Sequence, residues 1–139
     1  MLTIAVLAAL LTANPLADPE AAASSLVVKI ACLESPAGVV RVALFDSAES
    51  HLDTSIDSGV VSAAQEQPAW SSKRLAAGDY SLAIYHDVNE NDRLDRNLVG
   101  WPKEPYGFSN DLRIRFGPPK WTKAKFAVDG ATEVAVCVE

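Results

Sequence analysis

Oxygen-bearing side chains recur at alternate positions directly after a strand-like segment of this chain. They belong to Asp87, Asn89 and Asn91, and Asp95 follows four residues later. A curling backbone turns every second side chain toward one centre, and this spacing matches positions 1, 3, 5 and 9 of a calcium loop. Arg93 would offer its main-chain carbonyl oxygen at position 7. The series predicts a weak calcium site, with a dissociation constant on the order of 0.1–1 mM.

Two departures from the calcium pattern reduce the number of ligands. Position 6 is Asp92, where glycine is usual, and position 12 is Leu98, which carries no carboxylate. Glu104 or Asp111 could supply the missing oxygen if the chain folds back. Without a metal, the same side chains would cap backbone amides in Asx turns. Both interpretations stay open at the level of sequence.

A catalytic interpretation uses residues around the same series. His86 precedes Asp87 and could act as a general base that a carboxylate orients. A histidine at the inward end of a strand is more often structural, and no Ser or Cys nucleophile stands in a recognisable context. Asp87, Asp95 and Glu104 could also be cast as glycosidase carboxylates. A small hydrolase using His86, Asp87 and Glu104 is therefore the alternative function.

Aromatic, glycine, proline and amide residues crowd the segment that follows. They could form a stacking surface for a sugar or peptide, but we favour a role in sealing the loop against the domain. We expect residues 87–111 to form one long, ordered loop. The residues singled out there are Trp101, Tyr106, Phe108, Ser109 and Asn110.

Alternation of apolar and polar residues predicts the elements that position these groups. It predicts one all-β domain over residues 24–139, an antiparallel β-sandwich of about seven strands that is prealbumin-like or immunoglobulin-like. Tyr80 follows a glycine turn and indicates a tyrosine corner. Residues 47–69 are polar and irregular, and they could hold a short strand or a helical turn. The expected strands cover residues 26–33, 39–46, 70–75, 80–86, 112–116, 123–128 and 132–138.

Composition and the N-terminal segment limit the class of protein. With 139 residues there is room for one domain, and a net charge of −6 argues against nucleic acid as a partner. Residues 2–13 form an uncharged apolar run that is too short to span a bilayer. Small residues follow, which predicts a signal peptide over residues 1–23 with cleavage near Ala17 or Ala23. The alternative is a buried N-terminal helix. We expect a periplasmic or secreted protein with no transmembrane segment after cleavage.

Two cysteines could form a disulfide in an oxidising compartment. Cys32 shares the inward register of Ile30, whereas Cys137 alternates with the inward Val136 and Val138. The two thiols are therefore predicted on different faces, and only a bulge would align them. The sequence leaves the disulfide open.

The chain also carries a longer pattern. His-Asp-x-Asn-x-Asn-x-x-x-Asp precedes Gly-x-Pro-x-Glu-x-Tyr-Gly-Phe-Ser-Asn, and Gly-Pro-Pro with an aromatic residue follows. This resembles an uncharacterised family of exported bacterial proteins, a domain of unknown function, in which glycine is usual at the position of Asp92. The resemblance implies a prealbumin-like β-sandwich outside the cytoplasm, and it implies no established activity. The matching residues are His86, Asp87, Asn89, Asn91, Asp95, Gly100, Pro102, Glu104, Tyr106, Gly107, Phe108, Ser109, Asn110, Gly117, Pro118, Pro119 and Trp121.

These observations lead to one expectation and one alternative. We expect a non-enzymatic exported module whose loop over residues 87–110 binds calcium or presents a surface to a protein or small ligand. The alternative is a small periplasmic hydrolase or a carbohydrate-binding or carbohydrate-active protein.

Overall fold

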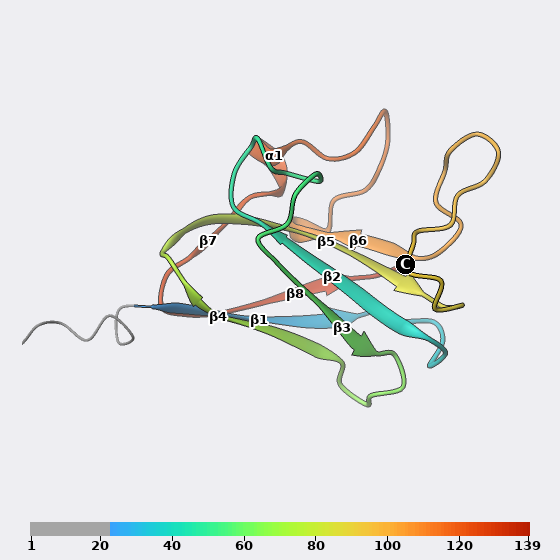
Figure 1. Cartoon of the computed structure of the whole chain (residues 1–139), viewed down its shortest axis with the longest axis horizontal. Coiled ribbons are helices and arrows are strands. Elements are labelled where there is room, and N and C mark those ends of the chain that lie inside the picture. Colours follow the sequence, from blue (N-terminus) through green and yellow to red (C-terminus); the bar gives the residue numbers. More distant parts are fainter. Residues whose placement is uncertain (1–22) are drawn as a thin grey trace, which may run out of the picture.

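The computed structural model describes residues 23–139, so nearly all of the predicted signal peptide lies outside the described residues. The described part is built from eight strands and two short helical turns (Figure 1). The strands are β1 (Ser24–Ala31), β2 (Val39–Phe45), β3 (Asp57–Ser62), β4 (Ala69–Leu75), β5 (Gly78–Asp87), β6 (Tyr106–Phe108), β7 (Phe126–Val128) and β8 (Ala131–Cys137). The turns are a 3-10 turn (Ser109–Asp111) and α1 (Trp121–Ala124).

Two sheets form the layers of a β-sandwich. A three-stranded sheet has the order β4-β1-β8, and a five-stranded sheet has the order β3-β2-β5-β6, with β7 paired to the start of β5. The predicted all-β sandwich is confirmed. One pairing differs from the antiparallel arrangement that we expected, because β1 and β8 run parallel. These strands come from opposite ends of the domain, so no tight hairpin dictates their relative direction.

The core lies between the two sheets, and the alternation of the sequence identifies its residues. Side chains at every second position of β1, β2 and β5 are buried, as predicted. The corner is also confirmed: the Tyr80 hydroxyl donates to the carbonyl oxygen of Ala76 at 2.6 Å. Burial raises the pKa of Tyr80, so this hydroxyl remains a donor. The central core residues are Leu26, Val28, Ile30, Val40, Val42, Leu44, Leu82, Ile84, Val128 and Val136.

One predicted strand is wrong, one is confirmed only in its second half, and one strand was missed. Residues 112–116 alternate like a strand but pair with no strand that the structure describes, and residues 123–128 divide between α1 and β7. The first segment is instead an extended wall with Phe116 fully exposed. The missed strand is β6, which has three residues, whereas β3, a polar strand with only Val61 buried, is the short strand for which residues 47–69 left room. Neither offers enough alternation to be recognised without its partner strand.

A disulfide joins Cys32 to Cys137, with their Cα atoms 5.1 Å apart. In the parallel register Cys137 lies beside Ala31, the last residue of β1. Cys32 has a φ of 67°, which ends the strand, and its side chain is exposed although Ile30 points inward. The left-handed turn at Cys32 therefore brings the two thiols to the same face, although the alternation of the sequence predicts them on different faces.

Loss of this bond should destabilise the domain strongly, because it spans 105 residues. Replacing both Cys32 and Cys137 with Ser should lower the free energy of unfolding by about 3–5 kcal/mol, since a long loop of the unfolded chain is released. Urea denaturation of the oxidised wild type and of the double variant measures the difference. Dithiothreitol should destabilise the wild type and leave the double variant unchanged. Equal stability of the two proteins would contradict the prediction.

Candidate functional site

The carboxylate of Asp87 organises the start of the long loop. It is fully buried, and its Oδ2 accepts a hydrogen bond from Arg41 Nε at 2.7 Å. Backbone amides of Asn91 and Asp92 donate to its two oxygens at 3.1 and 3.0 Å. The Arg41 guanidinium also contacts the Asp92 carboxylate. The end of β5, the neighbouring strand β2 and the first turn of the loop therefore meet at one charged group.

The protonation of Asp87 reflects two opposing effects. Burial disfavours the charged form and raises the pKa of Asp87, but the hydrogen bonds from Arg41, Asp92 and Asn91 outweigh it and hold that pKa below its ordinary value. The hydrogen bond with Asp87 is also the main reason why the pKa of Arg41 is raised. The pair is thus ionised at neutral pH.

The other oxygen-bearing residues of the series meet around Asp95. Side-chain amides of Asn89 and Asn91 each lie 2.8 Å from a different oxygen of this carboxylate. These two contacts lower the pKa of Asp95. Asp92, at the glycine position of a calcium loop, has a φ of 66° and adopts the left-handed conformation that the position requires. Arg93 donates its backbone N–H to Asn91 Oδ1 at 3.2 Å, which forms a local Asx-type turn.

Glu104 closes the loop. Its Oε1 accepts the amide of Val88 at 3.2 Å, and its Oε2 accepts the amide of Asp95 at 3.1 Å. Within residues 23–139, the one group of three acidic, histidine or cysteine ligand atoms that lie within 4.8 Å of one another belongs to Cys32, Cys137 and Glu139, whose cysteines are bonded together. The structure therefore brings Asn89, Asn91 and Asp95 together. Glu104 connects the start of the loop at Val88 to its middle at Asp95.

His86 lies away from solvent, on the inner face of β5. It is 1% exposed, and its Nε2 lies 2.5 Å from the carbonyl oxygen of Ala37. Its Nδ1 has no hydrogen-bond partner in the described part of the chain. His86 is thus next to Asp87 in sequence but on the opposite face of the strand.

The second half of the loop is a narrow hairpin, drawn in yellow to orange beside the C-terminus in Figure 1. The amide of Lys103 donates to the Asp95 carbonyl at 2.7 Å, and Arg96 forms a bridge with Pro102. At the tip, Asn97 Oδ1 accepts the amides of Val99 and Trp101, both at 3.0 Å. Its own backbone contacts therefore hold the hairpin in one shape.

The Tyr-Gly-Phe-Ser-Asn block joins the loop to the rest of the domain. Gly107 is required by close approach, because a Cβ there would lie 2.4 Å from the carbonyl oxygen of Cys137. Tyr106 and Glu139 exchange two backbone hydrogen bonds of 3.2 Å, which connect β6 to the end of the chain after β8. Residues 106–108 are therefore a strand, where we expected loop. Sequence alone could not show this, because the partner strands β5 and β8 lie elsewhere in the chain.

Ser109 and Asn110 continue this anchoring. The buried Ser109 hydroxyl accepts the amide of Leu82 at 3.0 Å and donates to the carbonyl of Ala124 at 2.6 Å. Asn110 has a φ of 60° and donates its side-chain amide to the carbonyls of Lys123 and Lys125. Both residues hold α1 in place.

A groove runs over the outer face of the five-stranded sheet. Its floor contains a row of small side chains, in which Ser58 pairs with Ala43, Ala43 with Ala83, and Ala83 with Phe108. The next row carries larger groups, because Arg41 lies between Val60 and Tyr85 in the register. The small residues leave a hollow of about 960 Å³.

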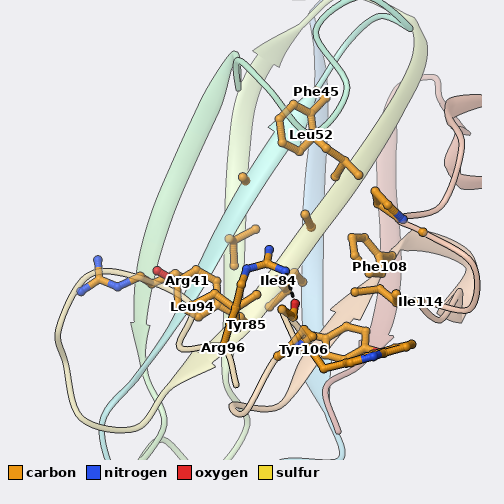
Figure 2. Close-up of a pocket in the computed structure, with 18 of the residues that line it drawn as sticks. Arg41, Phe45, Leu52, Ile84, Tyr85, Leu94, Arg96, Tyr106, Phe108 and Ile114 are labelled. Carbon is orange, nitrogen blue, oxygen red and sulfur yellow. Dashed lines mark hydrogen bonds between the residues drawn. The ribbon is translucent and has the colours of Figure 1, made fainter. Parts of the chain in front are cut away.

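Two segments of irregular backbone wall this hollow (Figure 2). The long loop supplies Leu94, Arg96 and Trp101, and the extended segment before Gly117 supplies Ile114 and Phe116. Trp101 and Phe116 are exposed, as is Val60 at the edge. The groove is therefore open to solvent and lined largely by aromatic and aliphatic side chains.

The charged residues of the groove all have one sign. Among the described residues that line it, Arg41, Arg96 and Arg115 are charged and none is Asp or Glu. In Figure 2 the guanidinium of Arg96 lies over the middle of the groove and that of Arg41 points away from it. Burial raises the pKa of Tyr85, although Arg41 opposes this shift, so the phenol adds no negative charge.

Comparison with known protein families matches residues 28–135 to a family described as uncharacterized protein conserved in bacteria (DUF2141). The chain belongs to this family. Comparisons with curated proteins and with solved structures give no match. Within residues 23–139, no helix is long and apolar enough to cross a lipid bilayer.

The predicted site residues and the groove overlap only in part. Trp101, Tyr106 and Phe108 line the groove, whereas His86, Ser109 and Asn110 do not. Sequence reasoning missed the floor and part of the second wall, including Ala43, Ala83 and Ile114. One signal in the sequence could have found the groove. Outward positions of β2 and β5 carry small or apolar residues, whereas the outward positions of a strand that faces solvent are normally polar.

Asp87→Asn should destabilise the domain at neutral pH by about 1–3 kcal/mol, because it removes a buried charge-assisted acceptor and the ionic partner of Arg41. The pKa of Asp87 is lowered in the folded state, so its contribution is present above the ordinary carboxyl pKa of about 3.9 and is lost as pH falls through the folded value. Urea denaturation at pH 7 and in the acid range should therefore show a smaller pH dependence for the variant. Identical pH profiles would contradict this role.

Proposed function

We propose that this protein is a non-enzymatic, exported β-sandwich module that binds a small apolar ligand in the groove. The observation that carries the proposal is the groove itself. Its volume of about 960 Å³ lies within the range of about 300–1,000 Å³ that is usual for small-molecule sites. Exposed Val60, Trp101 and Phe116 gather around it, and exposed apolar groups gathered at one place commonly mark a binding site.

The long loop suits the role of a preformed wall. Asp87 fixes its start, Glu104 joins its two halves, and Gly107 lets β6 approach the end of β8. A wall that is already ordered loses little conformational entropy when a ligand binds. This supports a loop that presents Trp101 and Leu94 to a ligand.

The surroundings of the hydrolase candidates favour the binding module. His86 is buried against a backbone carbonyl, and Asp87 is buried against Arg41. Both oxygens of Glu104 accept backbone amides. Each group thus has a structural partner, whereas a general base must reach a proton of the substrate.

Export is supported by the disulfide between Cys32 and Cys137, because such bonds persist mainly in oxidising compartments. The apolar N-terminal run with small residues after it agrees with the same proposal. The expected location is the periplasm or the exterior of a bacterial cell.

Calcium binding by the loop is a second candidate function. It is favoured by the left-handed Asp92 and by the nearness of Asn89 and Asn91 to Asp95, although both amides would have to turn over to offer oxygens in place of nitrogens to an ion. Arg41 already neutralises Asp87, so a calcium ion would have to share that carboxylate with a guanidinium. The proposed affinity is accordingly weak, on the order of 0.1–1 mM.

Ligand binding in the groove can be tested with N-phenyl-1-naphthylamine, a neutral apolar fluorescent probe. The wild type should enhance its fluorescence, and Ala43→Phe should weaken binding at least about tenfold, because the new ring fills the hollow between Ser58 and Ala83. Fluorescence titration gives the dissociation constants.

The matched control for Ala43→Phe is Ser71→Phe, which adds the same ring on an exposed position of β4 in the other sheet. This variant should bind the probe like the wild type. Absence of binding by the wild type, or equal weakening by both variants, would overturn the groove as the site.

Calcium at 10 mM should raise the free energy of unfolding by about 1.4 kcal/mol if the dissociation constant is about 1 mM. Asp95→Asn should abolish the increase, because Asp95 is the carboxylate at which the two asparagines meet. Urea denaturation with calcium or with chelator measures the effect. Asp53→Asn, in another loop, should respond like the wild type, and unchanged stability of the wild type would exclude the calcium proposal.

A further inference from the structure

The row of small residues on the groove floor offers a continuous path on which one unbranched chain could lie. It crosses β3, β2 and β5 at Ser58, Ala43 and Ala83 and ends at Phe108. Neighbouring strands lie about 4.8 Å apart, and successive side chains on one face of a strand lie about 6.7 Å apart. The hollow therefore runs across the strands over this row, and larger side chains such as Tyr85 line it from the neighbouring row.

The charged residues around the hollow indicate which kind of head group a ligand with an apolar chain would carry. Arg41 is paired with Asp87 and Asp92, so its charge is compensated. Arg96 has no acidic partner among the described residues and donates one hydrogen bond, from Nη1 to the carbonyl of Gly100 at 2.9 Å. Arg115 makes no hydrogen bond or ion pair with any residue in the described range 23–139. The two wall segments thus each contribute one uncompensated guanidinium.

These cations stand out against the charge of the whole protein. The chain has a net charge of −6, which repels anions at long range, yet no described Asp or Glu lines the groove. A second, smaller hollow of about 320 Å³ shares Arg115 and adds Arg113 and Lys123, with Asp111 as its acid. Arg113 is already paired with Glu139 and lies over the ring of Tyr106. Positive charge without an acidic partner is therefore supplied to the apolar groove by Arg96 and Arg115, one from each wall.

We infer that the ligand of the groove is a single-chain amphipathic anion, such as a long-chain monocarboxylate, whose chain lies over the small-residue row and whose acid group pairs with Arg96 and Arg115. The inference rests on the proposed function, because it assigns a chemical class to the same groove. Arginine donates paired hydrogen bonds that match the geometry of a carboxylate. The aromatic and aliphatic lining supplies an apolar environment for the chain.

Three amphiphiles with one shared chain test the inference. Dodecanoate and dodecyltrimethylammonium below their micelle concentrations, and dodecan-1-ol below its solubility limit, compete with N-phenyl-1-naphthylamine for the wild-type protein. Dodecanoate should displace the probe at a concentration about tenfold lower than dodecan-1-ol, and the cation should be the weakest competitor. Raising the salt concentration should reduce the preference for dodecanoate.

Matched variants test whether Arg96 and Arg115 recognise the acid group of the ligand. Arg115→Gln and Arg96→Gln should each reduce the preference for dodecanoate over dodecan-1-ol, and the double variant should abolish it while still binding the probe. Arg93→Gln and Lys120→Gln change neighbouring exposed cations that do not line the groove and should leave the preference unchanged. Arg115→Gln removes no described hydrogen bond, so loss of folding will not mimic its effect.

Each outcome separates the two proposals. Equal competition by all three amphiphiles would overturn the inference and leave the groove as an apolar site. Failure of the wild type to bind the probe or any amphiphile would overturn the proposed function as well. Binding only to vesicles that contain dodecanoate, with no competition by the monomer, would assign the surface to membranes and overturn the single-chain ligand.

Discussion

The buried carboxylate of Asp87 is the interaction on which the arrangement around the groove depends. It stands at the end of β5, where the inner face holds His86 and the outer face carries the groove. Because the carboxylate is desolvated, its charge must be satisfied, and Arg41 with two loop amides does this. The same contacts bend the chain into the loop and hold the start of the loop against Arg41 of β2. One electrostatic requirement therefore positions part of the floor and the beginning of one wall.

The most distinctive residues of the chain have structural rather than chemical roles. Gly107 lets two backbones approach, Ser109 joins β5 to α1, and Glu104 joins the halves of the loop. Polar groups in these places are buried or nearly so, and each needs a defined partner. This explains why a segment rich in reactive side chain types offers few free functional groups. The residues that face solvent in the groove are chemically plain by comparison.

The groove exposes apolar surface that a sandwich would ordinarily cover or replace with polar residues. Trp101 and Phe116 are exposed to water, while the small residues Ala43 and Ala83 leave space on the floor of the groove. Larger floor residues would bury more apolar surface and would stabilise the fold more. Such an arrangement is typical of a surface shaped for binding. The disulfide that links β1 to β8 lies in the other sheet, and the backbone bonds between Tyr106 and Glu139 join its end to the sheet under the groove.

The sequence by itself determined the sandwich, the buried face of β1, β2 and β5, and the tyrosine corner at Tyr80. Those features follow from period-two alternation and local turn chemistry, which act between near neighbours. Only the tertiary structure decided the rest. It paired β1 with β8 in parallel, formed the Cys32–Cys137 bond through the left-handed Cys32, and placed residues 112–116 as a wall rather than a strand. It also assigned Asp87 and Glu104 to backbone amides and joined Ala43 to Ala83 in one row, because contacts between distant segments choose partners that local patterns cannot specify.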